Sequence, residues 1–335
     1  MYTPLTYIII LNWNGWQDTI KCLDSVLKIN YLNYKTIVID NGSTNDSVTQ
    51  IENWVSRDCT FTNTIKTQQI QLPITNELNL DCSLMALNER LFIISHQENL
   101  GFSGGCNLGI AYALQEGADY IFLLNNDATI NSDALNQLIT VAQQAEASIA
   151  GAIVLNATGD QVLFAGSHWP NHLFFKSILT SYSGDEKFWD TPYVEGSALL
   201  AHKDVLRQRV SEYGYFLDPK LFLYYEDTDL CIYARERNCR CIIVRDAVIY
   251  HSLAKSSGGI RSCYYTTRNR IYIANNLLKP PLKVLFHLYY IPSRLGILLF
   301  KIASGQLKLN VAKATIHGLI DGYLAITGKW INHGN

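Results

Sequence analysis

The sequence lacks a strong net charge, which excludes one large class of function. Lysine and arginine total 27 and aspartate and glutamate total 29 among 335 residues, so the formal net charge is −2. Proteins that bind nucleic acid through their overall field carry a basic excess. We therefore expect no nucleic-acid partner, and any anionic ligand must be held by a local site.

A regular pattern of cysteines is also missing. The eight cysteines contain no CxxC pair and no repeated spacing, which predicts reduced thiols and a cytosolic compartment rather than a disulfide framework. Cys239 and Cys241 would share one face of a strand, but no further ligands follow at a suitable spacing, so a metal site there is not favoured.

Neither an export leader nor an uninterrupted membrane-length run is apparent. The start, MYTPLTYIIILNWNG, has no basic region, and its short apolar run predicts a strand. Residues 284–300 approach spanning length but include His287, Pro292 and Arg294, each costly or disruptive at mid-bilayer. We expect this run to be interfacial or buried and not to cross the bilayer.

Short apolar runs alternate with helical stretches through the first half of the chain. The predicted strands are 7–11, 35–40, 91–95 and 120–124, and the predicted helices are 16–29, 45–56 and 104–117. The strands show no polar alternation, so helices should cover both faces of a parallel sheet. A doubly wound α/β fold follows, with ligands at the carboxyl ends of the strands.

The second half has a more mixed pattern. Strands are predicted at 162–166, 193–202 and 241–251, and helices at 203–210 and 227–238. Residues 59–88, rich in Thr, Asn and Gln, are interpreted as an insertion whose role stays open.

The C-terminal segment differs from the rest in composition. Pro280 and Pro281 mark the strongest boundary. Residues 279–335 carry a net charge of +6, against −8 for the remainder. Such a basic, apolar tail can lie along an anionic membrane surface. The alternative is a pair of basic helices that closes the core.

Polar residues follow the first two strands, where ligands are expected. The first strand ends in Asn12, Trp13 and Asn14, and the second ends in Asp40. A carboxylate at this position can accept a hydrogen bond from a ribose hydroxyl or a base N–H. Ordinary strand-to-helix turns, which favour Asn, Gly and Ser, explain the same residues without a ligand.

A glycine-rich stretch, residues 98–109, follows the third strand and opens a helix. Glycines there let backbone N–H groups approach a diphosphate at a helix N-terminus. The next strand ends in Asn125, Asn126 and Asp127. An acid beside a diphosphate is where Mg²⁺ or Mn²⁺ is held, so Asp127 is the first candidate metal ligand, unless it only caps a helix.

Three acids, Glu226, Asp227 and Asp229, follow an aromatic run at the start of a predicted helix. Helix N-termini favour acids, but three exceed what capping requires. His251 ends the last predicted strand and can complete a metal shell, although a lone histidine is more often structural. Arg268 and Arg270 offer contacts to phosphate or acceptor, or lie on a helix surface.

In this order the segments resemble glycosyltransferase family 2, in particular its bacterial rhamnosyltransferase-like branch. The matching text lies within residues 5–276 and comprises ILNWNGWQDTIKCLDSVL, IVIDNGSTNDSV, ENLGFSGGCNLGI, DYIFLLNNDATI, VEGSALLAHKDVL, FLYYEDTDLCIYARERN, VIYHSLAKSSGG and YYTTRNRIYIANN. Eight ordered segments are far more specific than one glycine pattern.

The resemblance implies a GT-A fold, with a Rossmann-like, mostly parallel central sheet flanked by helices and a C-terminal helical extension. It divides the chain into a nucleotide-sugar-binding half (1–150), an acceptor and catalytic-base half (151–279) and a helical tail (280–335). The implied activity is inverting transfer of a sugar from a dTDP- or UDP-linked donor to a glycan or lipid-linked acceptor in cell-surface polysaccharide synthesis. The implied location is the cytoplasmic face of the membrane, which the tail contacts peripherally.

The resemblance also assigns roles to individual residues. Asp227 is the catalytic base, and Glu226 and Asp229 are supporting acids. A divalent metal, Mg²⁺ or Mn²⁺, is held by Asp127, with His251 as a further ligand because the first acid of the usual metal motif is replaced by Asn125. The donor-binding positions are Asn12, Asn14 and Asp40 for the nucleoside, and Asn99, Gly101, Asn107, Asn125 and Asn126 around the diphosphate and metal.

Two other classes of protein are weighed against this interpretation. A nicotinamide-dependent oxidoreductase places its glycine-rich turn after the first strand, with an acidic ribose partner some distance beyond, whereas the loop here follows the third strand. A non-catalytic sugar-binding or scaffold protein with the same fold would not need Asp127, Asp227 and His251 together.

Overall fold

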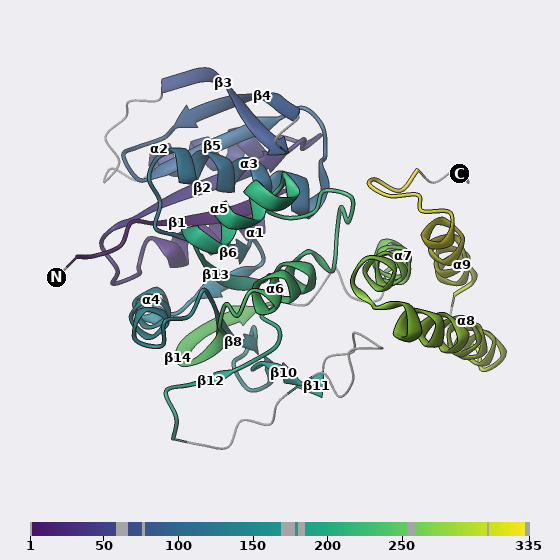
Figure 1. The fold of residues 1–335 in the computed structure, drawn as a ribbon. Helices are drawn as coiled ribbons and strands as arrows, with labels where there is room; N and C mark the ends of the chain where they lie inside the picture. Colours follow the sequence, from purple (N-terminus) through teal and green to yellow (C-terminus); the bar gives the residue numbers. More distant parts are fainter. Residues whose placement is uncertain are drawn as a thin grey trace.

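The computed structural model describes residues 2–57, 66–75, 78–168, 178–179, 185–252, 259–306 and 308–331. Part of the predicted insertion and residues 253–258 of the SLAKSSGG segment lie outside this range. In the described part, a large mixed sheet carries strands in the order β12-β14-β8-β13-β6-β1-β2-β5-β4-β3. The predicted α/β class, with a large central sheet flanked by helices, is confirmed (Figure 1).

The parallel centre of the sheet follows the sequence prediction. Its strands are β1 (Thr6–Asn12), β2 (Tyr34–Asn41), β5 (Leu91–His96) and β6 (Tyr120–Asn125). Their side chains are almost entirely buried, with Ile8, Ile10, Ile37, Val38 and Phe122 showing no exposed surface. Burial on both faces explains why these strands are apolar throughout.

Helices connect these strands. They are α1 (Trp16–Val26), α2 (Ser47–Arg57), α3 (Gly101–Gln115) and α4 (Ala134–Gln144). The first three correspond to predicted helices, and α4 was not predicted. Helix α3 packs against β1, β2 and β6, and glycines allow the close approach: a Cβ at Gly105 would lie 2.4 Å from Leu11 Cδ1.

The segment interpreted as an insertion is part of the sheet. It contains the hairpin β3 (Lys66–Thr75) and β4 (Leu78–Ala86), and β4 pairs antiparallel with β5. Leu72, Cys82 and Leu84 of the hairpin are buried in the core. The hairpin therefore extends the sheet at one edge.

The second half completes the other side of the sheet. Its strands and helices are β7 (Ala128–Ile130), β8 (Ile149–Asn156), β9 (Val162–Phe164), β12 (Phe188–Asp190), β13 (Ala198–His202), α5 (Lys203–Tyr213), α6 (Glu226–Glu236) and β14 (Cys241–His251), with a separate small pair β10 (Ser167–His168) and β11 (Ile178–Leu179). Strand β13 begins at Ala198 and not at residue 193 as predicted, because the Ala198 N–H closes a turn onto the Glu195 carbonyl.

Three C-terminal helices form a layer beside the sheet domain, α7 (Ile260–Leu277), α8 (Pro280–Ala303) and α9 (Leu309–Tyr323) (Figure 1). Helix α7 packs against both α8 and α9. Pro280 and Pro281 occupy the first turn of α8, where the missing N–H groups cost nothing. Most of α8 is exposed, so of the two expected placements of residues 284–300, burial in the fold is wrong and an interfacial position remains a prediction.

Candidate functional site

The strand register brings the predicted site residues to one edge of the sheet. Asn12 of β1 lies opposite Asp40 of β2, and Leu11 lies opposite Asn125 of β6. His251 ends β14 opposite Asn156 of β8 and Ala128 of β7. Since β1, β2, β6, β8 and β14 all run in the same direction, their carboxyl ends share this edge.

Asn12 and Asp40 form a buried pair at the centre of this edge. The Asn12 side-chain amide donates to Asp40 Oδ1 at 2.9 Å and to Ser43 Oγ at 3.2 Å, and its oxygen accepts from the Thr19 hydroxyl at 2.9 Å. Asp40 Oδ2 accepts from the Ser43 N–H. These groups hold the turns after β1 and β2, and their predicted contact with a nucleoside remains a prediction.

Asn14 also joins the two turns. Its backbone has a φ of 57°, its N–H donates to Ser43 Oγ, and its side-chain oxygen accepts from the backbone N–H groups of Thr44 and Asn45. The side chain is partly exposed. Asn14 therefore fixes the backbone of the turn that contains Trp13.

Protein groups accept hydrogen bonds from four consecutive backbone N–H groups where the glycine-rich loop enters α3. The Leu100 N–H donates to Asn41 Oδ1 and the Gly101 N–H to Asn99 Oδ1, while the N–H groups of Phe102 and Ser103 donate to the carbonyl of Phe222. The physical reason given for diphosphate binding at this helix N-terminus is therefore wrong. Asn41, which sequence reasoning missed, is a main organiser of the loop.

Gly101 has a structural requirement at this position. Its φ is +75°, and a Cβ there would lie 2.2 Å from the carbonyl oxygen of Phe222. Only glycine allows that close approach. Asn99 and Gly101 nevertheless line a cavity at this edge, so their place near a ligand remains a prediction.

Asn107 does not face the edge, which corrects its predicted place around the diphosphate. Its side chain is fully buried, its amide donates to the Leu217 carbonyl at 2.8 Å, and its oxygen accepts from the Leu217 N–H at 2.9 Å. A buried amide that pairs both ways with one residue clamps α3 to the segment after α5.

Asp127 and His251 lie in direct contact, as their joint role requires. His251 Nε2 lies 2.8 Å from Asp127 Oδ1, and the Asn125 amide lies 3.5 Å from the same ring nitrogen. Burial lowers the pKa of His251, but the hydrogen bond and charge of Asp127, together with the charge of Glu195, outweigh it and leave that pKa raised. Asn126 points elsewhere and donates to Thr19 Oγ1 in α1.

Asp127 and His251 suit a divalent cation that takes most of its ligands from phosphate and water oxygens. No cluster of three or more His, Cys, Asp or Glu side chains suited to a metal is found in the described part of the chain. Mg²⁺ and Mn²⁺ sites on nucleotides often use only one or two protein carboxylates, with phosphate and water oxygens completing the shell. Asp127 and His251 fit that requirement.

Asp227 is positioned from three sides at the start of α6. Its Oδ2 accepts from the Gly196 N–H at 2.8 Å and the Tyr193 hydroxyl at 2.9 Å, and its Oδ1 accepts from the Thr228 N–H at 2.6 Å. Burial raises the pKa of Asp227, and these hydrogen bonds, which favour the charged form, oppose that rise. The carboxylate is held in one orientation and remains partly exposed.

Glu195 connects the two groups and was not assigned from the sequence. Its pKa is raised to about 7, first by burial and then by the negative charge of Asp227, whereas His251 lowers it. The charges of both Asp227 and His251 act on its carboxyl group, so the three side chains are near enough for their charges to interact. The only signal in the sequence is its place in the VEGSALLAH segment.

Glu226 is the innermost acid of the group. It is 6% exposed, and its Oε2 atom has no hydrogen-bond partner among the described residues. Burial, and next the charge of Asp227, raise the pKa of Glu226 well above its usual range. Glu226 therefore favours its protonated, uncharged form more than an exposed glutamate does.

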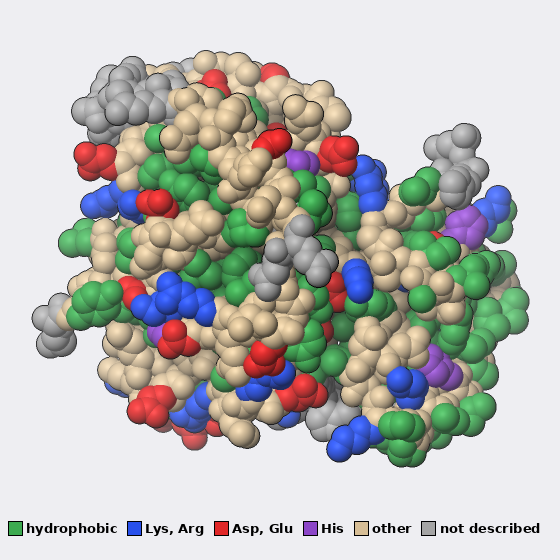
Figure 2. Space-filling view, turned by 45° about the horizontal axis from the view of Figure 1, so that its top comes forward, with side chains coloured by type: hydrophobic (Ala, Val, Ile, Leu, Met, Phe, Trp, Pro, Cys, Tyr) green, Lys and Arg blue, Asp and Glu red, His purple; other side chains and the backbone are tan. Residues whose placement is uncertain are grey.

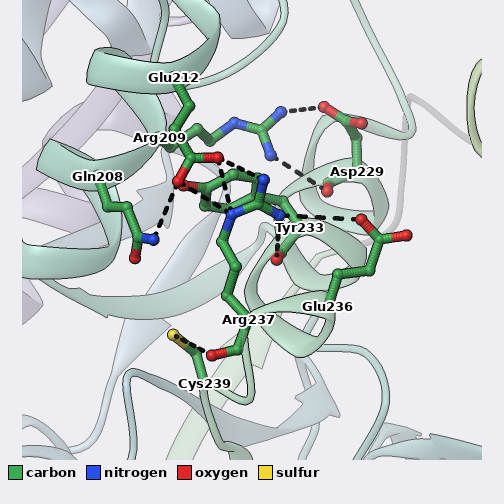
Figure 3. Close-up of polar contacts among 8 residues, drawn as sticks. All are labelled: Gln208, Arg209, Glu212, Asp229, Tyr233, Glu236, Arg237 and Cys239. Atoms are coloured by element: carbon green, nitrogen blue, oxygen red, sulfur yellow. Dashed lines mark hydrogen bonds and ion pairs between the residues drawn. The ribbon is translucent and has the colours of Figure 1, made fainter.

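Asp229 faces away from this crevice, so its predicted supporting role is wrong. It forms an ion pair with Arg209 of α5, and the Arg209 guanidinium also donates to the Asp229 carbonyl (Figure 3). Arg209 is 2% exposed, and a buried guanidinium needs such a partner. Asp229 thus joins α6 to α5, next to the Arg237–Glu212 pair.

The loop before α6 has an uncommon backbone conformation. Phe222, Tyr224 and Tyr225 have φ values of 64°, 69° and 76°, a region that costs non-glycine residues on the order of 1–3 kcal/mol each. Asn269 of α7 stabilises it by donating to the carbonyls of Leu221, Leu223 and Tyr224 at 2.8–2.9 Å.

Arg268 and Arg270 of α7 form hydrogen bonds with the same loop. Arg268 is 1% exposed and donates to the carbonyls of Lys220, Leu221 and Gly328. Arg270 donates to the Tyr225 hydroxyl at 2.7 Å. The interpretation of Arg268 as a phosphate or acceptor contact is therefore wrong, because its donors are directed at protein carbonyls, whereas that role of Arg270 remains a prediction.

Comparison with known families identifies the sequence class. The family model described as glycosyl transferase family 2 matches residues 7–69 and 77–210, more than half of the chain. The chain is 30% identical over 213 residues to the low-salt glycan biosynthesis hexosyltransferase Agl10 of Haloferax volcanii, covering 61% of this chain and 65% of that protein. It is 23% identical over 252 residues to the dTDP-rhamnosyl transferase RfbF of Shigella flexneri, covering 72% and 81%.

Solved structures share the fold. The mannosyltransferase PcManGT from Pyrobaculum calidifontis, in complex with GDP-Man and Mn²⁺, superposes with a TM-score of 0.57 at 14% identity, over 97% of this chain and 87% of that one. S. aureus TarS 1–349 in complex with UDP-GlcNAc gives a TM-score of 0.56 at 13% identity, over 96% and 81%. At these identities the likeness shows the GT-A fold alone.

Replacing Asn269 with alanine should destabilise the protein by about 2–3 kcal/mol, because three carbonyls of the loop before α6 lose their donor. Urea unfolding of the full chain measures this. Asn136→Ala in α4, which loses one hydrogen bond to Asp133, serves as the control. Equal midpoints for the two variants would show that Asn269 does not stabilise the loop.

Proposed function

The chain belongs to glycosyl transferase family 2, and from this premise we propose that it moves a hexose from a dTDP- or UDP-linked donor to a hydroxyl group of a glycan or lipid-linked acceptor. It is a glycosyltransferase. The single observation that supports this reaction is the contact of Asp127 with His251 at the carboxyl edge of the sheet, together with Glu195, whose carboxyl group is affected by the charges of both His251 and Asp227. One relative is named as a hexosyltransferase of glycan biosynthesis, which supports our proposal that the reaction serves cell-surface polysaccharide synthesis.

Asp227 acts as the base in this proposal. As the acceptor oxygen attacks the anomeric carbon, a C–O bond forms there, the bond from that carbon to the diphosphate oxygen breaks, and the nucleoside diphosphate leaves with the electron pair. The acceptor hydroxyl proton passes to Asp227, and attack from the side opposite the leaving group inverts the anomeric centre. Tyr193 and Gly196 orient the carboxylate for this transfer.

Asp127 and His251 would hold a divalent cation next to the diphosphate. Such a cation supplies Lewis-acid stabilisation of the leaving group. Asp127 supplies a carboxylate and His251 a ring nitrogen directed toward it. The Asn125 amide lies 3.5 Å from the same ring nitrogen.

The C-terminal helices provide a surface for peripheral membrane contact at the cytoplasmic face. Hydrophobic side chains gather on this layer together with lysines and arginines (Figure 2). Its exposed apolar residues include Leu285, Leu288, Leu299 and Phe300 of α8, Leu309 and Ile320 of α9, and Leu324 directly after α9. Helix α8 is long and apolar enough to cross a membrane by length and composition, but Arg294 and Pro292 within it favour a position along the surface.

Asp227→Asn should lower the rate of sugar transfer roughly 10²–10⁴-fold, the usual contribution of a general base, and leave donor affinity unchanged. Transfer from labelled UDP- and dTDP-hexoses to a membrane extract measures the rate, and calorimetry measures donor binding. Asp204→Asn, an exposed change on α5, should leave both unchanged. Near-normal transfer by the Asp227 variant would remove Asp227 from this role.

Tyr193→Phe should move the acid limb of the pH–rate profile to higher pH. The Tyr193 hydroxyl donates to Asp227 and lowers the pKa of that carboxyl, so its loss raises the pKa and the base form appears only at higher pH. Tyr112→Phe, in α3, removes a hydroxyl far from Asp227 in the sequence and should leave the profile in place. A limb that stays fixed or moves to lower pH in the Tyr193 variant would contradict this role.

Lys301→Glu combined with Lys308→Glu should release the full-length protein from vesicles that contain anionic lipid. Each cation near such a surface contributes about 1 kcal/mol, so reversing two of them should weaken binding at least tenfold. Co-sedimentation with vesicles of phosphatidylcholine and phosphatidylglycerol measures this. The pair Lys21→Glu and Lys187→Glu, on the sheet domain, is the control, and equal loss in both pairs would place the attachment elsewhere.

A further inference from the structure

A pocket of about 220 Å³ lies next to the crevice and is lined partly by the far C-terminus. Its walls come from the ends of β1 and β2, the loop before α3, the loop before α6, the start of α7 and the segment after α9. The lining residues that matter here are Trp13, Asn99, Phe222, Arg261, Lys329 and Trp330. Trp13, Asn99 and Phe222 lie in or next to segments that were predicted to form the site. Arg261, Lys329 and Trp330 do not.

The segment after α9 is docked in place. The Trp330 ring stacks on Tyr264 with centroids 4.3 Å apart, and the Trp330 N–H donates to the Tyr265 hydroxyl at 2.8 Å. The Gly328 N–H donates to the Lys220 carbonyl, and its carbonyl accepts from Arg268. These contacts fix Lys329 between two anchored residues, at the edge of the pocket.

Two cations stand at this pocket without a carboxylate partner. Within the described ranges, neither Arg261 nor Lys329 takes part in an ion pair, and both side chains are exposed. The Arg261 guanidinium lies 4.8 Å from the centre of the Trp13 ring, an arrangement that holds the cation in place. The rest of the lining is mostly aromatic or aliphatic, including Leu11, Phe102 and Tyr265.

The pocket lies beside the residues proposed to hold the metal. Leu11, in its wall, pairs with Asn125 across β1 and β6, and Asp127 follows two residues later. Phe222 and Leu223, also in its wall, lead through Tyr225 directly to Glu226 and Asp227. A ligand that extends from this pocket along the strand ends therefore reaches both carboxylates.

We propose that this pocket receives the nucleoside diphosphate of the donor, with Arg261 and Lys329 on its phosphate groups and the aromatic walls against its base. The proposal rests on the proposed function and adds that the C-terminal segment completes the donor site. Flat apolar walls suit a nucleobase, and paired cations suit a diphosphate. The C-terminal layer would then serve donor binding as well as membrane contact.

Calorimetry on the full chain with MnCl₂ tests this, using UDP, dTDP and GDP and the corresponding nucleosides as probes. Wild-type protein should bind one nucleotide more tightly than its nucleoside. Lys329→Ala and Arg261→Gln should each weaken binding of that nucleotide roughly tenfold, the loss expected for a hydrogen bond to a charged group. Neither should change nucleoside binding, because the nucleoside carries no phosphate.

Lys313→Ala, an exposed lysine of α9 outside the pocket, is the matched control and should bind like wild type. Unchanged thermal unfolding would show that the two variants fold, as expected for exposed side chains. Tight nucleotide binding by wild type that is unaffected in both variants would overturn this inference and leave the proposed function standing. A wild-type chain that binds none of the three nucleotides would overturn the proposed function itself.

Discussion

The crevice depends on holding several carboxyl groups close together despite their mutual repulsion. Asp127 contacts His251, while Glu195 and Glu226 are both affected by the charge of Asp227. Asp227 accepts hydrogen bonds from Tyr193, Gly196 and Thr228, which oppose the rise in its pKa that burial causes. Glu226 is buried, its Oε2 atom has no hydrogen-bond partner among the described residues, and its pKa is raised well above its usual range. Different hydrogen bonding thus gives these neighbouring carboxyl groups different tendencies to ionise, as the proposed base requires.

The helices after the sheet domain take part in this arrangement. Asn269 and Arg268 of α7 donate to carbonyls of the loop that leads into α6, and Phe222 of that loop lines the pocket. The Phe222 carbonyl in turn accepts from the first N–H groups of α3. Hydrogen bonds join this loop to both α7 and the glycine-rich loop, and the chain continues from it directly into Asp227. The orientation of Asp227 is therefore coupled to both elements.

Sequence patterns predicted the features that depend on neighbouring residues in the chain. The apolar strands β1, β2, β5 and β6 were located because burial on both faces leaves a continuous apolar run. The contact between Asp127 and His251 followed from placing both at strand ends. Asn107, Asp229 and Arg268 were misassigned because their partners, Leu217, Arg209 and the carbonyls of the loop before α6, are fixed only by tertiary packing. The β3–β4 hairpin was missed because its polar exposed face obscured a core-facing set that includes Leu72 and Leu84.

The donor pocket could not be predicted from the sequence, because it too is formed by tertiary packing. Lys329 and Trp330 lie more than 300 residues from Trp13 in the chain and meet it only because α9 packs against α7. No local pattern marks either residue as part of a ligand site. The pairing of Arg261 with Trp13 likewise depends on where α7 begins.

The position of a bound metal ion tests the central claim most directly. Anomalous diffraction from crystals of the full chain grown with Mn²⁺ and the nucleoside diphosphate that it binds would locate the ion. We predict a single peak in contact with Asp127 and His251, in the crevice faced by Asp227. A bound nucleotide whose Mn²⁺ lies away from these residues, or on a different face from Asp227, would contradict this account.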